Sequence, residues 1–307
     1  MDIRQLRTFV QVAEMRSITR AAAALHTAQP ALSRQLRLLE EELGETLFER
    51  GERGVTLTAA GEQLLHRATS LVRDFDSLKT DLARRSRALS GHVRFGVPKS
   101  LMESYVAPAV AEFHETYPAI SMALIEGTTL ELREQVRMGA LDLAIVSDLD
   151  RSPSARMQSL FREPLVLAAH AASKLRMSRP VSLRTVAEQV LVTASRPNVI
   201  RLTLEDALHR EGLAPRWGFE TNSHVAARIL ASSGKVHAAL TYSAIAVELK
   251  AGHIAAAPIQ GAAITWNIIV TPLRELPRQA AVLRGFMIDA AAAWVKKQRW
   301  PSGLLED

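Results

Sequence analysis

Residues 17–44 follow the pattern of a short capped helix, a tight turn and a longer helix, which requires a compact helical domain. Ser17 stands in the N-cap position before an apolar-periodic stretch at 18–25. Pro30 lies in the first turn of the longer helix, where its missing N–H costs nothing. Gly44 ends that helix. The spacing predicts a helix-turn-helix whose inner face comprises Leu32, Leu36, Leu39 and Leu43.

The outer face of the longer helix has a composition that suits the DNA major groove. Arginine can bond guanine through two hydrogen bonds, and glutamine can bond adenine in the same way. A helix N-terminus also favours a phosphate. The candidate DNA-contacting residues are Gln29, Pro30, Ser33, Arg34 and Arg37. A solvated surface helix carries the same residue types, so the spacing alone leaves DNA binding and simple exposure as alternatives.

Residues 48–57 interrupt the helical pattern. Gly51 and Gly54 predict the tight turn of a small β-hairpin. Arg50 and Arg53 lie on this hairpin, in position to reach the DNA backbone or the minor groove.

The helical period resumes from Thr58 to about Leu89. A helix of this length spans roughly 45 Å, which is too long to lie inside a small domain. We expect it to pair with another helix, from a second copy of the chain. Its apolar seam comprises Leu64, Leu65, Ala68, Leu71, Val72, Phe75, Leu78 and Leu82.

Composition limits the class of protein. The 307 residues correspond to about two domains at roughly 150 residues each. Because 48% of the residues are hydrophobic and 23% charged, wholesale disorder is excluded. The chain has no cysteine, which excludes disulfides, thiolate metal sites, Fe–S clusters and cysteine catalysis.

Charge alone does not argue for a nucleic-acid partner. The net charge is +6, but residues 1–90 hold 14 basic and 12 acidic side chains, so the excess is spread thinly. A DNA-binding function must therefore rest on where individual arginines lie.

After Gly91 the pattern changes to alternating strands and helices, which implies doubly wound sheets with helices on both faces. Strands are predicted at 92–97, 120–126, 141–147, 165–169, 190–193, 238–242 and 267–271. Helices are predicted at 101–117, 130–139, 200–212, 224–233 and 279–299.

The first 90 residues resemble the winged helix-turn-helix of the LysR-type transcriptional regulators, and the order of elements resembles that family to the C-terminus. The matching stretches are LRTFV at 6–10, SITRAA at 17–22, AQPALSRQL at 28–36, LEEELG at 39–44, LFER at 47–50 and TLTAAG at 56–61.

The resemblance implies an α/β protein with a mostly α-helical winged helix-turn-helix at 1–58, a linker and dimerisation helix at 59–90, and an effector-binding domain at 91–307. This last domain would be two-lobed, like a periplasmic binding protein. Lobe one would comprise 91–161 and 268–300, and lobe two 162–267. The chain would cross between the lobes near 161–164 and 265–267.

The function implied is sequence-specific regulation of transcription, without catalytic activity. The partners implied are double-stranded DNA, RNA polymerase, further copies of the chain in a homodimer or homotetramer, and a small-molecule inducer for which an anionic compound is one candidate. The family's DNA-contacting positions correspond to the outer-face residues named above and to Arg50 and Arg53. Neither a cofactor nor a metal is implied.

Polar residues at the ends of predicted strands are candidates for inducer binding. Helix N-termini with hydroxyl groups and a cation can form a cradle for a carboxylate or phosphate. N-capping explains serine, threonine and asparagine at these positions equally well. The candidates are Lys99, Ser100, Thr128, Thr129, Asn198 and His224.

Other function classes find less support. The sequence has no glycine-rich phosphate loop, no HExxH and no GxSxG, and its nine histidines lack metal-ligand spacing. A solute-binding protein would carry an export signal, whereas charged residues interrupt residues 1–20. No run of 18 apolar residues exists, so we expect no membrane span and a cytoplasmic location. An architectural DNA-binding protein remains an alternative.

Overall fold

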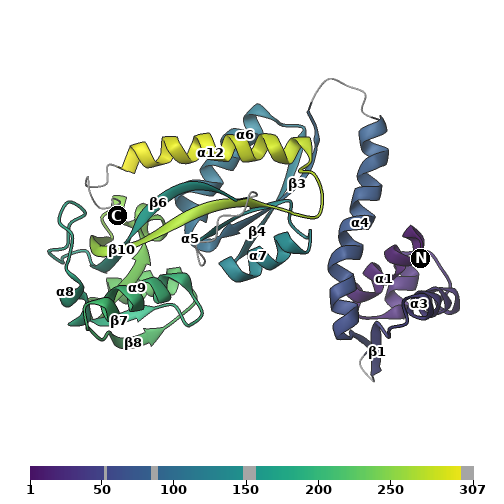
Figure 1. Ribbon diagram of the computed structural model, residues 1–307, viewed down its shortest axis with the longest axis horizontal. Helices are drawn as coiled ribbons and strands as arrows, with labels where there is room; N and C mark the ends of the chain where they lie inside the picture. Colours follow the sequence, from purple (N-terminus) through teal and green to yellow (C-terminus); the bar gives the residue numbers. More distant parts are fainter. Residues whose placement is uncertain (52–53, 84–88, 148–156, 299–307) are drawn as a thin grey trace.

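The computed structural model describes residues 1–51, 54–83, 89–147 and 157–298 (Figure 1). The N-terminal domain is a helical core with a two-stranded hairpin, as the sequence predicts. Its elements are α1 (Ile3–Met15), α2 (Ile18–Ala24), α3 (Gln29–Leu43), β1 (Phe48–Gly51) and β2 (Gly54–Leu57).

Side-chain and backbone caps fix the helix ends of this domain. Asp2 accepts hydrogen bonds from the backbone N–H groups of Arg4 and Gln5 and so begins α1. The Ser17 hydroxyl accepts from the Arg20 N–H at 3.3 Å, which confirms the predicted cap of α2. Gly44 adopts a φ of +70° directly after α3, the left-handed conformation that glycine tolerates best.

The N-terminal core is built on the inner faces of the helices. Phe9 packs against Phe48 with ring centroids 5.3 Å apart, which joins α1 to the hairpin. Leu32, Leu36 and Leu39 of α3 are buried in the same core. The prediction for Leu43 is wrong: its side chain is 37% exposed, because it lies in the last turn of α3, beyond the core.

Helix α4 (Ala59–Ala83) occupies most of the range in which the sequence predicts a helix. Thr58 precedes it, and its hydroxyl accepts from the Gly61 N–H at 3.0 Å. Residues 84–88 lie outside the described residues. Leu89, near which the helix was predicted to end, is not helical and packs against the core of the C-terminal domain.

The apolar seam of α4 is divided between two environments. Ala68 is buried in the N-terminal core, and Leu64, Leu65 and Val72 pack against it. Leu71 and Phe75 are exposed, at 51% and 38%. The side chains of residues 78 and 82 lie outside the described residues. Half of the predicted seam therefore holds α4 on its own domain. Leu71 and Phe75 leave apolar surface exposed, although the Arg7 guanidinium lies 5.8 Å from the centroid of the Phe75 ring.

The C-terminal domain alternates strands and helices, as predicted. Its elements are β3 (Gly91–Pro98), α5 (Lys99–Leu101), the π-helix η1 (Met102–Val106), α6 (Ala107–Thr116), β4 (Ile120–Gly127), α7 (Thr129–Arg137), β5 (Leu143–Ser147), β6 (Met157–His170), α8 (Leu183–Ala187), β7 (Val190–Thr193), α9 (Val199–Arg210), β8 (Arg216–Glu220), α10 (His224–Ser232), β9 (His237–Thr241), α11 (Tyr242–Lys250), β10 (Ile254–Val270) and α12 (Arg278–Gln298).

The C-terminal strands form one continuous sheet rather than separate sheets, with the order β4-β3-β5-β10-β6-β9-β7-β8. We call β4, β3 and β5 with helices α5, η1, α6, α7 and α12 lobe one. Lobe two comprises β9, β7 and β8 with helices α8, α9 and α10. In Figure 1, α6 and α12 cover one face of the lobe-one strands and α7 the other.

Two long strands, β6 and β10, connect the lobes. They run antiparallel to each other, and Phe161 and Pro164 of β6 pair with Trp266 and Ala263 of β10. β10 also pairs with β5 of lobe one, and β6 pairs with β9 of lobe two. The segments near 161–164 and 265–267, where the sequence places the crossings between the lobes, thus lie side by side in the antiparallel pair of β6 and β10.

The core of lobe one combines the beginning and the end of the C-terminal domain. Phe95 of β3 and Phe113 of α6 are buried in the same cluster as Leu283 and Met287 of α12. No helix in the described part of the chain is both long and apolar enough to cross a bilayer.

Candidate functional site

The outer face of α3 is an exposed, basic surface. Gln29, Pro30, Arg34 and Arg37 are exposed, and Ser33 is half-buried. Within the described residues, neither of these arginines has an ion-pair partner. Arg53 and the side chain of Arg50 lie outside the described residues, so the structure says nothing of their part in this surface.

The N-terminus of α3 is open to an external acceptor. The residue before the helix is Ala28, which offers no side-chain hydrogen bond to the first turn, and Pro30 removes one of the N–H groups there. The remaining backbone donors and the helix dipole therefore favour an anion such as a DNA phosphate.

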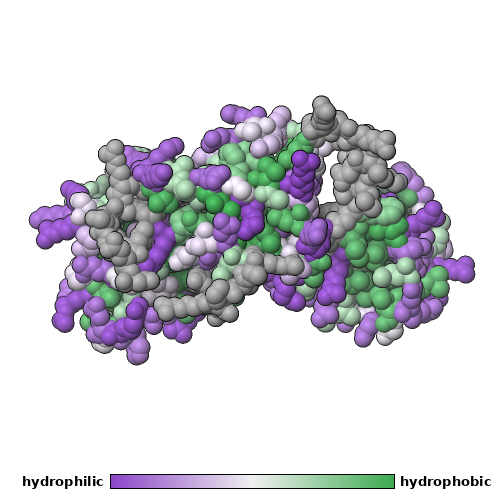
Figure 2. Space-filling model, turned by 45° about the horizontal axis from the view of Figure 1, so that its top comes forward, coloured by the Kyte–Doolittle hydropathy of each residue, from purple (hydrophilic) through white to green (hydrophobic). Residues whose placement is uncertain are grey.

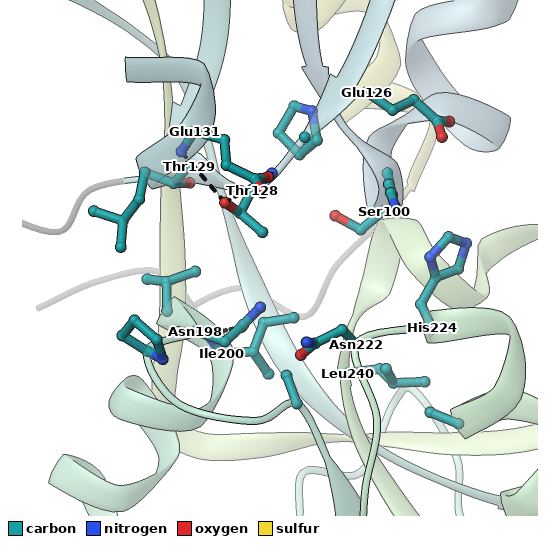
Figure 3. Close-up of a pocket in the computed structure, with 18 of the residues that line it drawn as sticks. Ser100, Glu126, Thr128, Thr129, Glu131, Asn198, Ile200, Asn222, His224 and Leu240 are labelled. Atoms are coloured by element: carbon teal, nitrogen blue, oxygen red, sulfur yellow. Dashed lines mark hydrogen bonds between the residues drawn. The ribbon is translucent and has the colours of Figure 1, made fainter. Parts of the chain in front are cut away.

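A cavity of about 410 Å³ lies between the two lobes (Figure 3). Its walls come from the β3–α5 and β4–α7 junctions of lobe one and from the β7–α9 and β8–α10 junctions of lobe two. Each junction places the start of a helix at the cavity, and Trp266 of β10 also lines it.

The six residues predicted for inducer binding all line this cavity, namely Lys99, Ser100, Thr128, Thr129, Asn198 and His224. Asn222, in the same loop as His224, lines the cavity as well. Glu126, Glu131 and Leu240 also line it, and the sequence did not single these three out. The sequence pattern did not indicate a role for Glu126 and Glu131, because a charged side chain near the end of a strand is usually an ordinary solvent-exposed residue.

Hydrogen bonds fix the lobe-one wall. Thr128 is the N-cap of α7, and both its backbone N–H and its hydroxyl donate to Glu131 Oε2, at 2.8 and 2.9 Å. These bonds lower the pKa of the Glu131 carboxyl. The Thr129 hydroxyl is 2.6 Å from that of Ser147 and accepts from the Ser147 N–H at 3.0 Å.

The lobe-two wall is held in the same way. Asn198 caps α9 through an Oδ1 that accepts from the Ile200 N–H at 2.9 Å. Asn222 accepts from the Ser195 N–H at 3.3 Å. Burial, followed by the Arg228 cation, lowers the pKa of His224, which favours its neutral imidazole near pH 7.

Behind the cavity, a buried carboxylate joins the two inter-lobe strands. Glu163 of β6 is fully buried, and it accepts hydrogen bonds from Trp266 Nε1 of β10 and from the N–H and hydroxyl of Ser243, the latter two at 2.7 and 2.8 Å. Burial raises the pKa of Glu163 to about 7, against the opposing effect of these donors.

Known proteins resemble both parts of the chain. The family described as "Bacterial regulatory helix-turn-helix protein, lysR family" matches residues 3–62, and the "LysR substrate binding domain" matches residues 86–292. The transcriptional regulator BbuR of Bordetella bronchiseptica is 29% identical over 98% of this chain and 93% of its own length. The regulator DgdR of Burkholderia cepacia is 32% identical over 81% of each chain.

Solved structures share the fold. Full-length CbnR in complex with its target DNA has a TM-score of 0.71 at 22% identity, covering 96% of this chain and all of that one. Full-length OxyR from Pseudomonas aeruginosa has a TM-score of 0.70 at 23% identity, covering 95% and 94%. The chain has a helix-turn-helix at one end and a two-lobed domain with a cavity between its lobes at the other, and the two LysR family models together match most of its length. The chain therefore belongs to the LysR family of transcriptional regulators.

Proposed function

We propose that this regulator reads promoter DNA through the outer face of α3. Gln29, Arg34 and Arg37 supply the donors that recognise base edges, and the uncapped start of α3 supplies N–H groups for a phosphate. CbnR, which shares the fold, was solved in complex with its target DNA. We include Pro30 and Ser33 in the contact surface, together with the wing residues Arg50 and Arg53.

The second part of the proposal is an oligomer formed through α4. Leu71 and Phe75 leave apolar surface exposed on this helix, and Figure 2 shows hydrophobic surface on the N-terminal domain. A second copy that covered α4 would set two α3 helices in successive major grooves, about 34 Å apart. Pairing of two such dimers gives a homotetramer.

The third part is an inducer in the cavity between the lobes. The observation that carries it is the convergence of hydroxyl, amide and cationic side chains from both lobes on one cavity of about 410 Å³. Lys99, Ser100 and the helix starts suit an anionic group of the inducer, and the cavity volume suits a small metabolite.

The mechanism we infer is a population shift. An inducer that contacts both lobes stabilises one arrangement of them over others. The lobe arrangement governs how the dimers pair, and that pairing sets how far the DNA is bent, which changes contact with RNA polymerase. A cytoplasmic location and the lack of catalytic activity belong to the same proposal.

The DNA-reading surface is tested with Arg34→Ala. Loss of a guanine-bonding arginine costs about 1–3 kcal/mol at the correct site, so we expect specific protection of promoter DNA in footprinting to disappear. The oligomeric state should be unchanged, as judged by size-exclusion chromatography with light scattering. The matched control is Arg210→Ala, an exposed arginine at the end of α9.

Unchanged promoter protection by Arg34→Ala would overturn the assignment of α3. Protection spread over all fragments at a stated salt concentration would instead indicate an architectural DNA-binding protein.

The cavity is tested with the double variant Ser100→Ala/Thr128→Ala. We expect metabolites that raise the melting temperature of the wild-type chain to lose that effect, while DNA affinity without them is retained. Because Thr128 also caps α7, the control is Ser182→Ala, which removes the cap of α8 outside the cavity. A normal response of the double variant would remove these residues from the inducer site.

A further inference from the structure

The two walls of the inter-lobe cavity differ in charge. The formally charged side chains that line it are Lys99, Glu126 and Glu131, and all three belong to lobe one. Lobe two contributes amides and apolar groups, among them Ile200 and Leu240. Figure 3 shows Ser100, Thr128 and Glu131 across the cavity from Asn198 and Ile200. The cavity therefore suits a ligand with a charged head and an apolar body.

One of the three charges is already used by the fold. Both hydrogen bonds from Thr128 converge on the same oxygen of Glu131, and the Glu131 N–H donates in return to the Thr128 hydroxyl, which completes the capping box of α7. The Thr129 hydroxyl is likewise engaged, with Ser147. The charged groups left for a ligand are one cation, Lys99, and one anion, Glu126.

Lys99 and Glu126 come from neighbouring strand ends. The parallel strands β3 and β4 place Val97 beside Glu126 and Pro98 beside Gly127, and Lys99 follows directly. The backbones of neighbouring strands lie about 4.8 Å apart. A single small ligand can therefore contact the side chains of both Lys99 and Glu126.

Lys99 and Glu126 are not held in ion pairs, although the Lys99 cation helps to lower the pKa of the Glu131 carboxyl after the hydrogen bonds from Thr128. Within the described residues, Lys99 and Glu126 form no ion pair and no side-chain hydrogen bond, with each other or with any other residue. Both nevertheless act on the same imidazole: the Lys99 cation lowers the pKa of His224, and the Glu126 carboxylate raises it. Lys99 and Glu126, neither of them in an ion pair, thus lie near His224 at one end of the cavity, with the Glu126 carboxylate on the His224 side of Ser100 in Figure 3.

We propose that the inducer is a zwitterion, an α-amino acid with an apolar side chain. Its carboxylate binds Lys99 and the Ser100 hydroxyl, which Figure 3 shows directed into the cavity. Its ammonium group binds Glu126, and its side chain packs on Ile200 and Leu240 of lobe two. The inference rests on the proposed function of the cavity as the inducer site.

Ligands with a single kind of charge fit this arrangement less well. A dicarboxylate places its second charge beside Glu126, and a simple amine leaves Lys99 unmatched. A zwitterion satisfies both groups, because each forms a charge-assisted hydrogen bond with the opposite charge of the ligand.

The experiment compares ligands that share one carbon skeleton, on the full-length chain by isothermal titration calorimetry. The probes are L-leucine, α-ketoisocaproate, which lacks the ammonium group, and isopentylamine, which lacks the carboxylate. L-Valine, L-methionine and L-phenylalanine extend the panel to other apolar side chains. We expect at least one amino acid to bind, and its oxo-acid and amine analogues to bind about 10- to 100-fold more weakly.

Two variants test separately whether Glu126 binds the ammonium group and whether Lys99 binds the carboxylate of the ligand. Glu126→Gln should abolish the preference for the amino acid over the oxo acid, and Lys99→Met should abolish the preference over the amine. Matched controls are Glu112→Gln on α6 and Lys174→Met, both outside the cavity. Damage to the fold would weaken all ligands together and would not shift these two preferences in different directions.

The outcomes separate this inference from the function on which it rests. Binding of the oxo acid or the amine as tight as that of the amino acid, with loss on Ser100→Ala/Thr128→Ala, would overturn the zwitterion and leave the inducer site in place. Failure of the whole panel of amino acids to bind would also overturn the zwitterion. Binding of an amino acid that no cavity variant alters would overturn both.

Discussion

The buried Glu163 offers a direct test of how the inter-lobe strands are held together, through the variant Glu163→Gln. In the folded protein its pKa is raised to about 7, because burial disfavours the carboxylate; in the unfolded chain it returns to near 4.5. Between these values the folded state binds a proton that the unfolded state has lost. The contribution of Glu163 to stability is therefore greatest below pH 4.5 and is lost as the pH rises towards 7.

The size of this loss follows from the two pKa values. The gap between 4.5 and about 7, at about 1.4 kcal/mol for each pH unit, corresponds to about 3 kcal/mol of folding free energy. Tyr242, whose pKa is raised by burial and then by Glu163, stays neutral throughout this window and does not contribute. Glutamine cannot ionise, so the variant should lack this component of the pH dependence.

The assay is equilibrium unfolding in urea at a series of pH values, at one protein concentration, followed by tryptophan fluorescence. All four tryptophans lie after residue 90, so the signal reports on the C-terminal domain. The quantity of interest is the unfolding free energy of the wild type minus that of Glu163→Gln, since other titrating groups cancel in this difference. We expect it to fall by about 3 kcal/mol from pH 4.5 to 7 and then to level off.

A constant offset between the two proteins has a separate meaning. Glutamine alters the acceptors for Trp266 and Ser243, which shifts the difference equally at every pH. The exposed Glu112→Gln serves as the control for removing a carboxylate. A difference that does not change with pH, or one that rises between pH 4.5 and 7, would refute the burial argument.

Two further predictions concern the N-terminal half. Gly54→Ala should destabilise the N-terminal domain by about 2 kcal/mol or more, because a Cβ there would lie 2.4 Å from the Arg16 carbonyl oxygen at a φ of +123°. Gly51→Ala, at the other end of the same turn, should lower the stability much less, because a Cβ there would contact nothing within 4 Å. Thermal unfolding followed by far-ultraviolet circular dichroism compares the two variants, and equal losses of stability would contradict the hairpin geometry. Leu71→Asp on α4 should weaken self-association about tenfold or more in sedimentation equilibrium. The equally exposed Leu273→Asp should not, and wild-type association of Leu71→Asp would exclude this face of α4 as an interface.

The sequence predicted the N-terminal domain well because its signals are local. The Ser17 cap, the Gly44 stop and the leucine spacing each act within one or two helical turns. Strand β8 was missed because four of its five residues are exposed on an edge strand that contains Gly218. Helix α11 was missed because it begins at Tyr242 directly after β9, without a glycine or proline between them.

Long-range pairing was beyond the reach of the sequence pattern. Nothing local indicates that β5 pairs with residues of β10 more than 100 positions later, or that β10 runs for 17 residues through Pro258 and Gly261. The candidate cavity residues were found because polar residues at strand ends form a recurring pattern. Glu126 was not found, since its significance lies in its lack of a partner, which only the structure shows.

The return of the chain to lobe one has a consequence for how the protein is made. Phe95 and Phe113 leave the ribosome well before Leu283 and Met287, which complete their cluster from α12, the last helix among the described residues. The strand order places β10 between β5 and β6 as well. Lobe one therefore cannot close before α12 has left the ribosome, and a nascent or truncated chain without α12 exposes apolar surface that chaperones must cover.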